Sequence, residues 1–249
     1  MLNIVLAFLP PFSILQSVFK EVNFSHYIES NFWGRYPRAV IDHASAMVDI
    51  PKSCFSFVLD HSGILGIYYG SPEETWEHAR KLSARHHIRQ VGQTFQKVLA
   101  VLPKKYNDMW VGGKGMYKTE PVVADGGEVI IYAPHITEVS RTHGKVIREI
   151  GYHVSEYFLK QWNQFKHYPG GVLAHSTHIK GMGHFDAVTG TEVPRISVSL
   201  ATGIEKSVCE DLNLSYRDPA SIKIDDWVGR EDEGILVVEN AGEILYRVK

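Results

Sequence analysis

Cysteine is scarce in this sequence. The 249 residues include two, Cys54 and Cys209, which lie far apart and form no CxxC pair. This pattern does not fit the disulfide framework of a small secreted domain. We expect two free thiols in a reducing, cytoplasmic environment, although the sequence alone leaves a disulfide between them open.

Excess charge and long hydrophobic runs are also missing. The formal net charge is −2 and the pI is about 6.7, so no basic field attracts nucleic acid or an anionic membrane. The apolar start, MLNIVLAFL, is cut short by Pro10 and Pro11, and it has neither a basic flank nor a cleavage site. It is therefore unlike a signal peptide or a membrane span. We expect it to be a buried strand or helix in a chain that starts partway into a larger fold.

Familiar motifs of catalysis and nucleotide binding are absent as well. The stretch MWVGGKGMY fails the Walker A pattern because Gly115 follows Lys114, and it is not GxGxxG either. Ser176 lies between His175 and His178 but lacks the GxSxG elbow. Thirteen histidines nevertheless favour an enzyme, because imidazole serves as acid, base or ligand near neutral pH.

The apolar pattern of the first part predicts two helices and a pair of strands. Apolar residues recur at helical spacing over 37–48. Two apolar runs, 54–59 and 64–69, flank a short turn that contains glycine and predict paired strands. A helix follows, with Ser71 as its cap and Pro72 in its first turn.

Strands and helices alternate from about residue 96 onward. GGEVIIYAP is apolar, β-branched and bounded by Gly and Pro, as expected for a buried parallel strand. RISVSLATG predicts another strand, and the tail GILVVENAGEILYRV predicts two more. Helices are predicted over 142–165, in part, and over 204–214, whereas GVLAHSTH is interpreted as a strand or tight segment.

This alternation predicts an α/β fold with an open, mostly parallel, Rossmann-like sheet that carries helices on both faces. We expect a smaller mixed α+β part over residues 1–95 and the α/β domain over 96–249. Ligands of such folds bind beyond the carboxyl ends of the strands. Three polar loops follow predicted strands and are expected to share one cleft: HITEVSRTHG with His135 and His143, HSTHIKG, and ATG at 201–203.

The segment HSTHIKGMGH supports three interpretations. Gly181 and Gly183 argue against a helix, so the i, i+3 spacing of His175 and His178 does not by itself place the two rings on one face. The spacing is a weak zinc signature. Hydrogen bonding to a polar substrate, above all by His175, and a merely structural role are the alternatives.

The stretch MWVGGKGMY is the second candidate for a ligand-binding segment. Gly112 and Gly113 allow a close backbone approach to a ligand, and Lys114 supplies a charge suited to a carboxylate or phosphate. The alternative is a helix start with a solvated lysine.

YNDMWVGGKGMYKTEPVVADGGEVIIYAPHITEVSRTHG resembles the C-terminal domain of the nickel-dependent lactate racemase family. Tyr106, Asp108, an aromatic at Trp110 and Lys114 match a segment of that family. Upstream, IDHASAMVDIPKSCFSFVLDHSGILGIYYGSP is similar to the end of the family's N-terminal domain. The likeness covers residues 35–240.

The resemblance implies a racemase or epimerase of 2-hydroxy acids that works by reversible hydride transfer with a nickel pincer nucleotide as cofactor. In the family a lysine tethers that nucleotide, a histidine binds nickel, and two further histidines act on the hydroxyl as acid and base. His26 lies where the nickel histidine would precede the hairpin. No tethering loop is found, and Val111 replaces a substrate-binding glutamine, which leaves the substrate open. The histidine-rich loops fit a larger polyol acid such as a sugar acid better than lactate.

We therefore expect an isomerase in truncated or split form, inactive by itself, whose partner is a separately encoded N-terminal half. The expected substrate contacts are Lys114, Trp110, His135, His143, His175 and His178. The main alternative is a non-catalytic α/β binding subunit. A zinc hydrolase that uses His175 and His178 is a third possibility.

Overall fold

The structure, a computed structural model, describes residues 43, 46–47 and 49–249. The expected helix over 37–48 therefore falls almost entirely outside the described residues. The apolar start of the chain and His26, the candidate nickel ligand, lie outside them as well.

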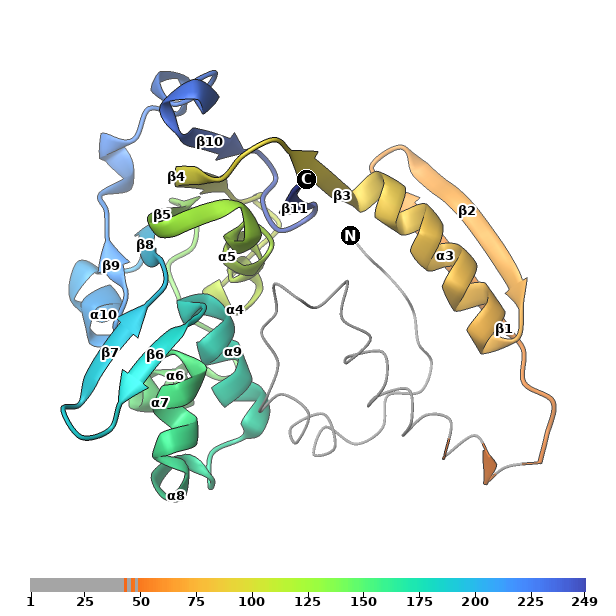
Figure 1. Ribbon diagram of the computed structural model, residues 1–249, viewed down its shortest axis with the longest axis horizontal. Coiled ribbons are helices and arrows are strands. Elements are labelled where there is room, and N and C mark those ends of the chain that lie inside the picture. Colours follow the sequence, from red (N-terminus) through yellow and green to blue (C-terminus); the bar gives the residue numbers. More distant parts are fainter. Residues whose placement is uncertain (1–42, 44–45, 48) are drawn as a thin grey trace.

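A hairpin and a helix open the described part. Strands β1 (Cys54–Asp60) and β2 (Gly63–Gly70) pair antiparallel, as predicted, and α3 (Pro72–His87) packs on one face of the pair. Ser71 caps α3 through a reciprocal contact, because its hydroxyl accepts from the Glu74 amide while the Glu74 carboxylate accepts from the Ser71 amide. This unit stands apart from the larger sheet and is joined to it through β3 (Ile88–Val91) (Figure 1).

Ser71→Ala is expected to destabilise α3 by about 1 kcal/mol, because the Glu74 amide at the helix start loses its side-chain acceptor. Hydrogen exchange of the α3 amides measures the effect. Ser207→Ala is the matched control, since Ser207 is exposed in a short helix and caps nothing. Equal exchange rates in wild type and Ser71→Ala would contradict the assignment of the cap.

A five-stranded parallel sheet forms the centre of the molecule, which confirms the α/β class. Its strand order is β10-β4-β5-β8-β9. The strands are β10 (Ile235–Val238), β4 (Phe95–Val101), β5 (Val123–Ala133), β8 (Ser197–Thr202) and β9 (Ser215–Tyr216). The predicted GGEVIIYAP strand is the central one, and its valine and isoleucines are fully buried, as strands covered on both faces require. A domain boundary near residue 95, where β4 begins, stays a prediction.

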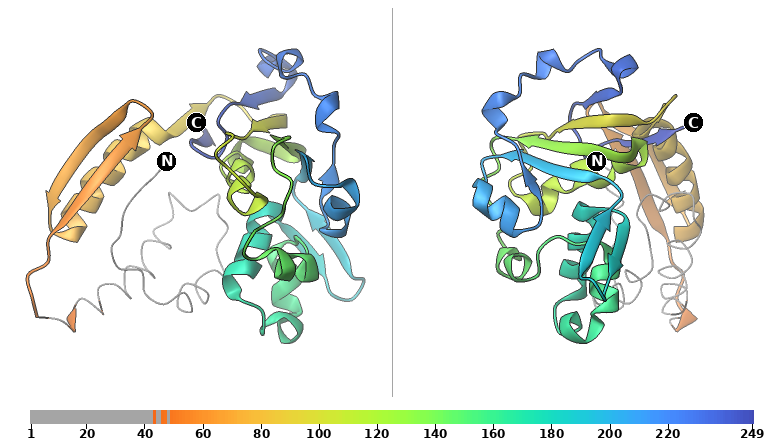
Figure 2. Two further views of the ribbon diagram at one scale, coloured as in Figure 1. Left: turned by 180° about the vertical axis from the view of Figure 1, so that it is seen from behind. Right: turned by 60° about the vertical axis from the view of Figure 1, so that its left-hand side comes forward.

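The two faces of the sheet are covered differently. Helices α4 (Met109–Gly112), α5 (Lys114–Tyr117), α6 (Gly144–Ile150), α7 (Ser155–Lys160), α8 (Trp162–Phe165), α9 (Gly170–Lys180) and α10 (Lys206–Asp211) contribute side chains to the large core on one face. The other face is a smaller cluster around Leu99 and Ile130, covered by the 3₁₀ turns η3 (Pro219–Ser221) and η4 (Ile224–Asp226). Helices were expected on both faces of the sheet, but this second face carries only short 3₁₀ turns (Figure 2).

The two predicted tail strands are present but do not pair with each other. β10 joins the edge of the five-stranded sheet beside β4, whereas β11 (Leu245–Val248) pairs in parallel with β3. A separate hairpin, β6 (Gly183–Asp186) and β7 (Thr191–Pro194), precedes β8.

The interpretation of GVLAHSTH as a strand is wrong, because this stretch is the middle of helix α9. Gly181 lies after the helix rather than inside it. Its φ of +86° lies in the left-handed region, and its amide donates back to the Thr177 carbonyl, as glycine does where a helix ends. The residue that argued against a helix is the one that ends it.

Candidate functional site

Two short helices at the carboxyl end of β4 form the floor of the site. Asp108 caps α4 by accepting from the Val111 amide at 3.1 Å, and its second oxygen accepts from the Arg141 amide at 3.2 Å. That second bond ties α4 to the loop after β5. Gly113 keeps a helical conformation, so α5 continues α4 with little change of direction.

Gly112 and Gly113 do allow a close approach, but from side chains of the core. A Cβ on Gly113 would lie 2.8 Å from Cδ1 of Ile179 and 3.4 Å from Cε1 of His175, and one on Gly112 would lie 3.0 Å from Cδ1 of Leu102. The expectation that these glycines admit a ligand is therefore replaced by a packing role. Gly113 lets α9 lie directly against the junction of α4 and α5, whereas Gly112 lets α4 pack closely on Leu102.

The Trp110 ring contacts two histidines that are distant in the sequence, and a third histidine lies nearby on Tyr117. Its ring centroid lies 4.0 Å from that of His175, at an interplanar angle of 27°, and 4.4 Å from that of His143. One helical turn along α9, His178 meets Tyr117 of α5 at 5.9 Å. Trp110, His143, His175 and His178, all predicted as substrate contacts, are thus assembled from three segments of the chain.

Burial keeps the histidines of α9 uncharged. Burial, with smaller contributions from the nearby His178 and His143, lowers the pKa of His175 to about 3. Burial also lowers the pKa of His178 to about 4, although part of that residue stays at the surface. At neutral pH both rings can exchange hydrogen bonds with a hydroxyl, but they are weak bases, because a base works best near its own pKa.

Two buried polar atoms of this region have no hydrogen-bond partner within the described part of the chain. They are Nε2 of His175 and the hydroxyl of Tyr152, whose rings lie 6.0 Å apart at a steep angle. Burial raises the pKa of Tyr152, with a further contribution from Asp108. Buried polar groups are nearly always paired in proteins, so these two atoms mark a place where a polar ligand can be received.

Lys114 and His135 lie around a different ring, that of Tyr106. The ammonium group of Lys114 lies 5.6 Å from the Tyr106 ring centroid. His135 is exposed and places Nε2 3.1 Å from the Tyr106 carbonyl oxygen. No direct contact joins His135 to the Trp110 cluster within the described residues, so the six predicted contacts fall into two neighbouring groups rather than one.

A second lysine gives the surroundings of Lys114 more positive charge. Lys118 donates to the Glu243 carbonyl at 3.2 Å, and burial, with the charge of Lys114, lowers its pKa to about 8. The Glu243 carboxylate is paired with Lys105. This leaves Lys114, half-buried against an aromatic ring, available to an anion.

The loops after β5 and β8 meet as expected. The amide of Gly203 donates to the Ile136 carbonyl at 2.8 Å, and a Cβ on Gly203 would lie 2.9 Å from the Pro134 carbonyl oxygen. The third contributor, His175, arrives from a helix rather than from a loop at a strand end.

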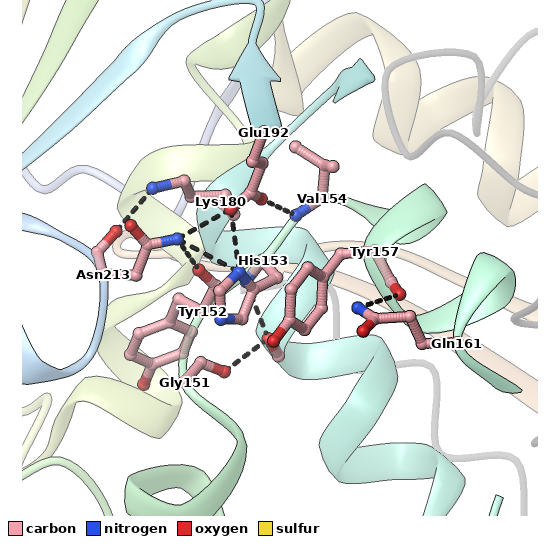
Figure 3. A network of polar contacts seen from close by, with 10 residues as sticks. Gly151, Tyr152, His153, Val154, Tyr157, Gln161, Lys180, Glu192 and Asn213 are labelled. Carbon is pink, nitrogen blue, oxygen red and sulfur yellow. Dashed lines mark hydrogen bonds and ion pairs between the residues drawn. The ribbon is translucent and has the colours of Figure 1, made fainter. Parts of the chain in front are cut away.

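A polar network holds α9 against the segment that carries Tyr152 (Figure 3). The Ser176 hydroxyl donates to the Gly151 carbonyl at 2.7 Å and accepts from the His153 amide. His153 Nδ1 lies 2.8 Å from a Glu192 oxygen that also accepts from Asn213, and the His153 ring stacks on Tyr157 at 3.7 Å. Neither Tyr152 nor this network was predicted, and no motif in the sequence indicates them.

The described residues contain neither a cluster of metal ligands nor a helix suited to cross a membrane. No three His, Cys, Asp or Glu side chains are grouped there as metal ligands. Cys54 and Cys209 both carry free thiols. None of the described helices has the length and apolar character that a bilayer crossing requires. The zinc hypothesis therefore receives no support from His175 and His178, and the candidate nickel ligand His26 lies outside the described residues.

Comparison with solved structures identifies several similar chains, among them the following two. A structural-genomics protein from Thermotoga maritima matches with a TM-score of 0.76 and 32% identity, over 86% of this chain and 54% of that one. The lactate racemase apoprotein from Thermoanaerobacterium thermosaccharolyticum matches with a TM-score of 0.63 and 15% identity, over 88% of this chain and 50% of that one. No family model and no curated protein matches. The chain thus spans about half the length of both structures, and the second likeness shows a shared fold.

Proposed function

We propose that this chain is the substrate-side α/β part of an isomerase, a racemase or epimerase of 2-hydroxy acids. The observation that carries the proposal is the assembly of three histidines around Trp110 and Tyr117. Lys114 lies between these two aromatic residues in the sequence. All three follow the carboxyl end of the parallel strand β4, the edge at which such sheets bind ligands. The fold shared with lactate racemase supports the same reaction class.

The chemistry of these residues suits an anionic, hydroxylated acid. Lys114 is placed to bind the carboxylate, and Trp110 offers a planar wall beside it. The uncharged His175 and His178 suit hydroxyl groups rather than a second anion. Because three histidines gather around Trp110 and Tyr117 and can hydrogen-bond to several hydroxyls, we favour a substrate with more hydroxyls than lactate, such as a sugar acid.

Inversion at C2 requires more than binding. The hydroxyl proton must go to a base and the hydrogen on C2 must leave as hydride, giving a planar keto acid, and both must then return with the hydride on the opposite face. Protein side chains do not accept hydride, and no lysine loop that would tether the nickel nucleotide is found in this sequence. We therefore assign this part of the chain to substrate binding. The partner we propose is a separately encoded N-terminal half that supplies the cofactor tether.

The purified 249-residue chain is expected to hold no stoichiometric nickel and not to racemise lactate, even after co-expression with the enzymes that make the nucleotide. The reason is that the sequence contains no recognisable lysine loop that would tether the nucleotide. Metal analysis by mass spectrometry and polarimetry of lactate measure the two properties. One tightly held nickel per chain would contradict this expectation.

A non-catalytic α/β binding subunit is the second candidate function. The low pKa values of His175 and His178 favour it, since neither ring is a good base at neutral pH. The two functions differ in a reconstituted mixture with an N-terminal half that carries cofactor. Loss of optical activity of a 2-hydroxy acid indicates the isomerase, whereas binding without loss indicates the subunit.

A further inference from the structure

A second lysine, Lys118, lies one helical turn beyond Lys114 on the same face of the helix that α4 and α5 form together. The Lys118 amide donates to the Lys114 carbonyl at 3.3 Å, which closes that turn. Side chains four residues apart are neighbours on a helix surface, with Cβ atoms about 5–6 Å apart. Trp110 lies one turn before Lys114. An aromatic ring and two ammonium groups therefore follow one another along this face.

The turn before β11 forms the opposite wall of this place. Gly242 has a φ of +95°, and a Cβ on it would lie 2.8 Å from Cβ of Lys114 and 3.0 Å from the Tyr106 ring. Glycine there lets the chain pass directly against the lysine. The next residue, Glu243, offers its carbonyl oxygen to the Lys118 ammonium group at 3.2 Å. The two lysines are therefore held between α5 and this turn.

Positive charge exceeds negative charge between these walls. The Glu243 carboxylate is paired with Lys105, and within the described part of the chain neither Lys114 nor Lys118 forms an ion pair with a carboxylate. Like charges one turn apart on a helix destabilise it. Burial, with the charge of Lys114, lowers the pKa of Lys118 to about 8. Two cations kept together at such a cost are typical of a site that binds an anion.

We propose that Lys114 and Lys118 together bind a doubly charged acid. The carboxylate beside the reacting carbon contacts Lys114, and a second negative group, a carboxylate or a phosphate, contacts Lys118. The Lys118 ammonium group has three N–H donors, of which the Glu243 carbonyl uses one, so donors remain for the second group. This inference rests on the proposed function, because it takes Lys114 as the contact of the first carboxylate. Lys118 determines specificity and takes no part in the reaction itself.

Calorimetry with three acids of one carbon skeleton tests the proposal. Gluconate carries a single carboxylate, glucarate adds a carboxylate at the far end, and 6-phosphogluconate adds a phosphate there. We expect at least one of the doubly charged acids to bind the 249-residue chain about tenfold or more tightly than gluconate, as a hydrogen bond between charged groups provides. The acid that gains affinity identifies the second group.

Lys118→Met keeps most of the length of the side chain and removes its charge. This variant should lose the preference for the doubly charged acid and bind gluconate within a factor of two of the wild type. Lys104→Met is the matched control, because it removes the same charge from an exposed position on the loop that leads to α4. It should keep the full preference.

A second measurement needs no variant. In nuclear magnetic resonance spectra of the wild-type chain, the doubly charged acid should shift the amide signals of Lys118 and Glu243 more than gluconate does. Circular dichroism verifies that both variants are folded.

Three outcomes would overturn the proposal. The three acids bind the wild type equally and shift the Lys118 signal equally. The preference persists in a folded Lys118→Met variant. Lys104→Met loses the preference as well, which would assign it to the general field of the region. In each of these cases gluconate still binds, so the proposed function stands, whereas binding of none of the acids would contradict both.

Discussion

In calorimetry, Lys114→Ala is expected to bind a 2-hydroxy acid roughly ten- to a hundredfold more weakly than the wild-type chain, a loss of about 1.5–3 kcal/mol. This is the range for a hydrogen bond to a charged group. The side chain sits half-buried against Tyr106, and the nearby Glu243 carboxylate is paired with Lys105. A substrate carboxylate would therefore meet a cation that is available to it.

Lys104→Ala is the matched control, because Lys104 is exposed on the loop that leads to the same helix. It removes the same charge from the same region and should leave the affinity within a factor of two. If both variants bind like the wild type, Lys114 has no role in anion binding. If both weaken binding equally, only the general field of the region matters.

Acid is expected to destabilise the protein through His175. The pKa of the ring is about 3 in the folded chain and near 6.5 when the chain is unfolded. Between these values the unfolded chain binds a proton that the folded chain does not, so stability falls as the pH drops below about 6.5. At pH 5 the difference of about 1.5 pH units corresponds to a loss of about 2 kcal/mol from this one residue.

Urea denaturation at pH 7 and pH 5 measures this loss. His175→Phe keeps a ring against Trp110 but cannot take a proton, so it should reduce the pH dependence by about 2 kcal/mol. His86→Phe, at an exposed position of α3, should leave the dependence unchanged. The account of a buried, neutral His175 would be wrong if wild type and His175→Phe lose equal stability on acidification.

The sheet could be predicted because its strands carry their own signal. Residues 126–134 form an apolar, β-branched run between glycine and proline, and such a run fits a strand buried on both faces. The hairpin and α3 were predictable for a similar reason, since the turn and the Ser71 cap are local features. Local chemistry decides these elements, and tertiary contacts do not change them.

Helix α9 could not be predicted in this way. Its small, β-branched and polar residues have weak helical periodicity, and the helix is stabilised by packing of Val172 and Ile179 in the core. For Gly113 the sequence predicted a position where the backbone can approach a ligand closely. In the structure the space beside Gly113 is filled by Ile179, from a segment 66 residues away in the sequence.

Residue type and strand position were enough to name the residues of the candidate site. They were not enough to predict how these residues are arranged around one another. Trp110, His143 and His175 come together because α9 lies against α4, which no spacing in the sequence reveals. Tyr152 was missed altogether. A lone tyrosine between glycine and histidine has no pattern, and its importance depends on its burial beside His175.

The central claim is that the surface around Lys114 and Trp110 binds an anionic hydroxy acid, and a nuclear magnetic resonance titration tests it most directly. Lactate and a sugar acid such as gluconate are added to isotopically labelled 249-residue chain. Saturable shifts at the Trp110 indole, the His178 ring and the Lys114 amide, larger for gluconate, are the predicted result. Shifts confined to other surfaces, or none up to high millimolar acid, would contradict it.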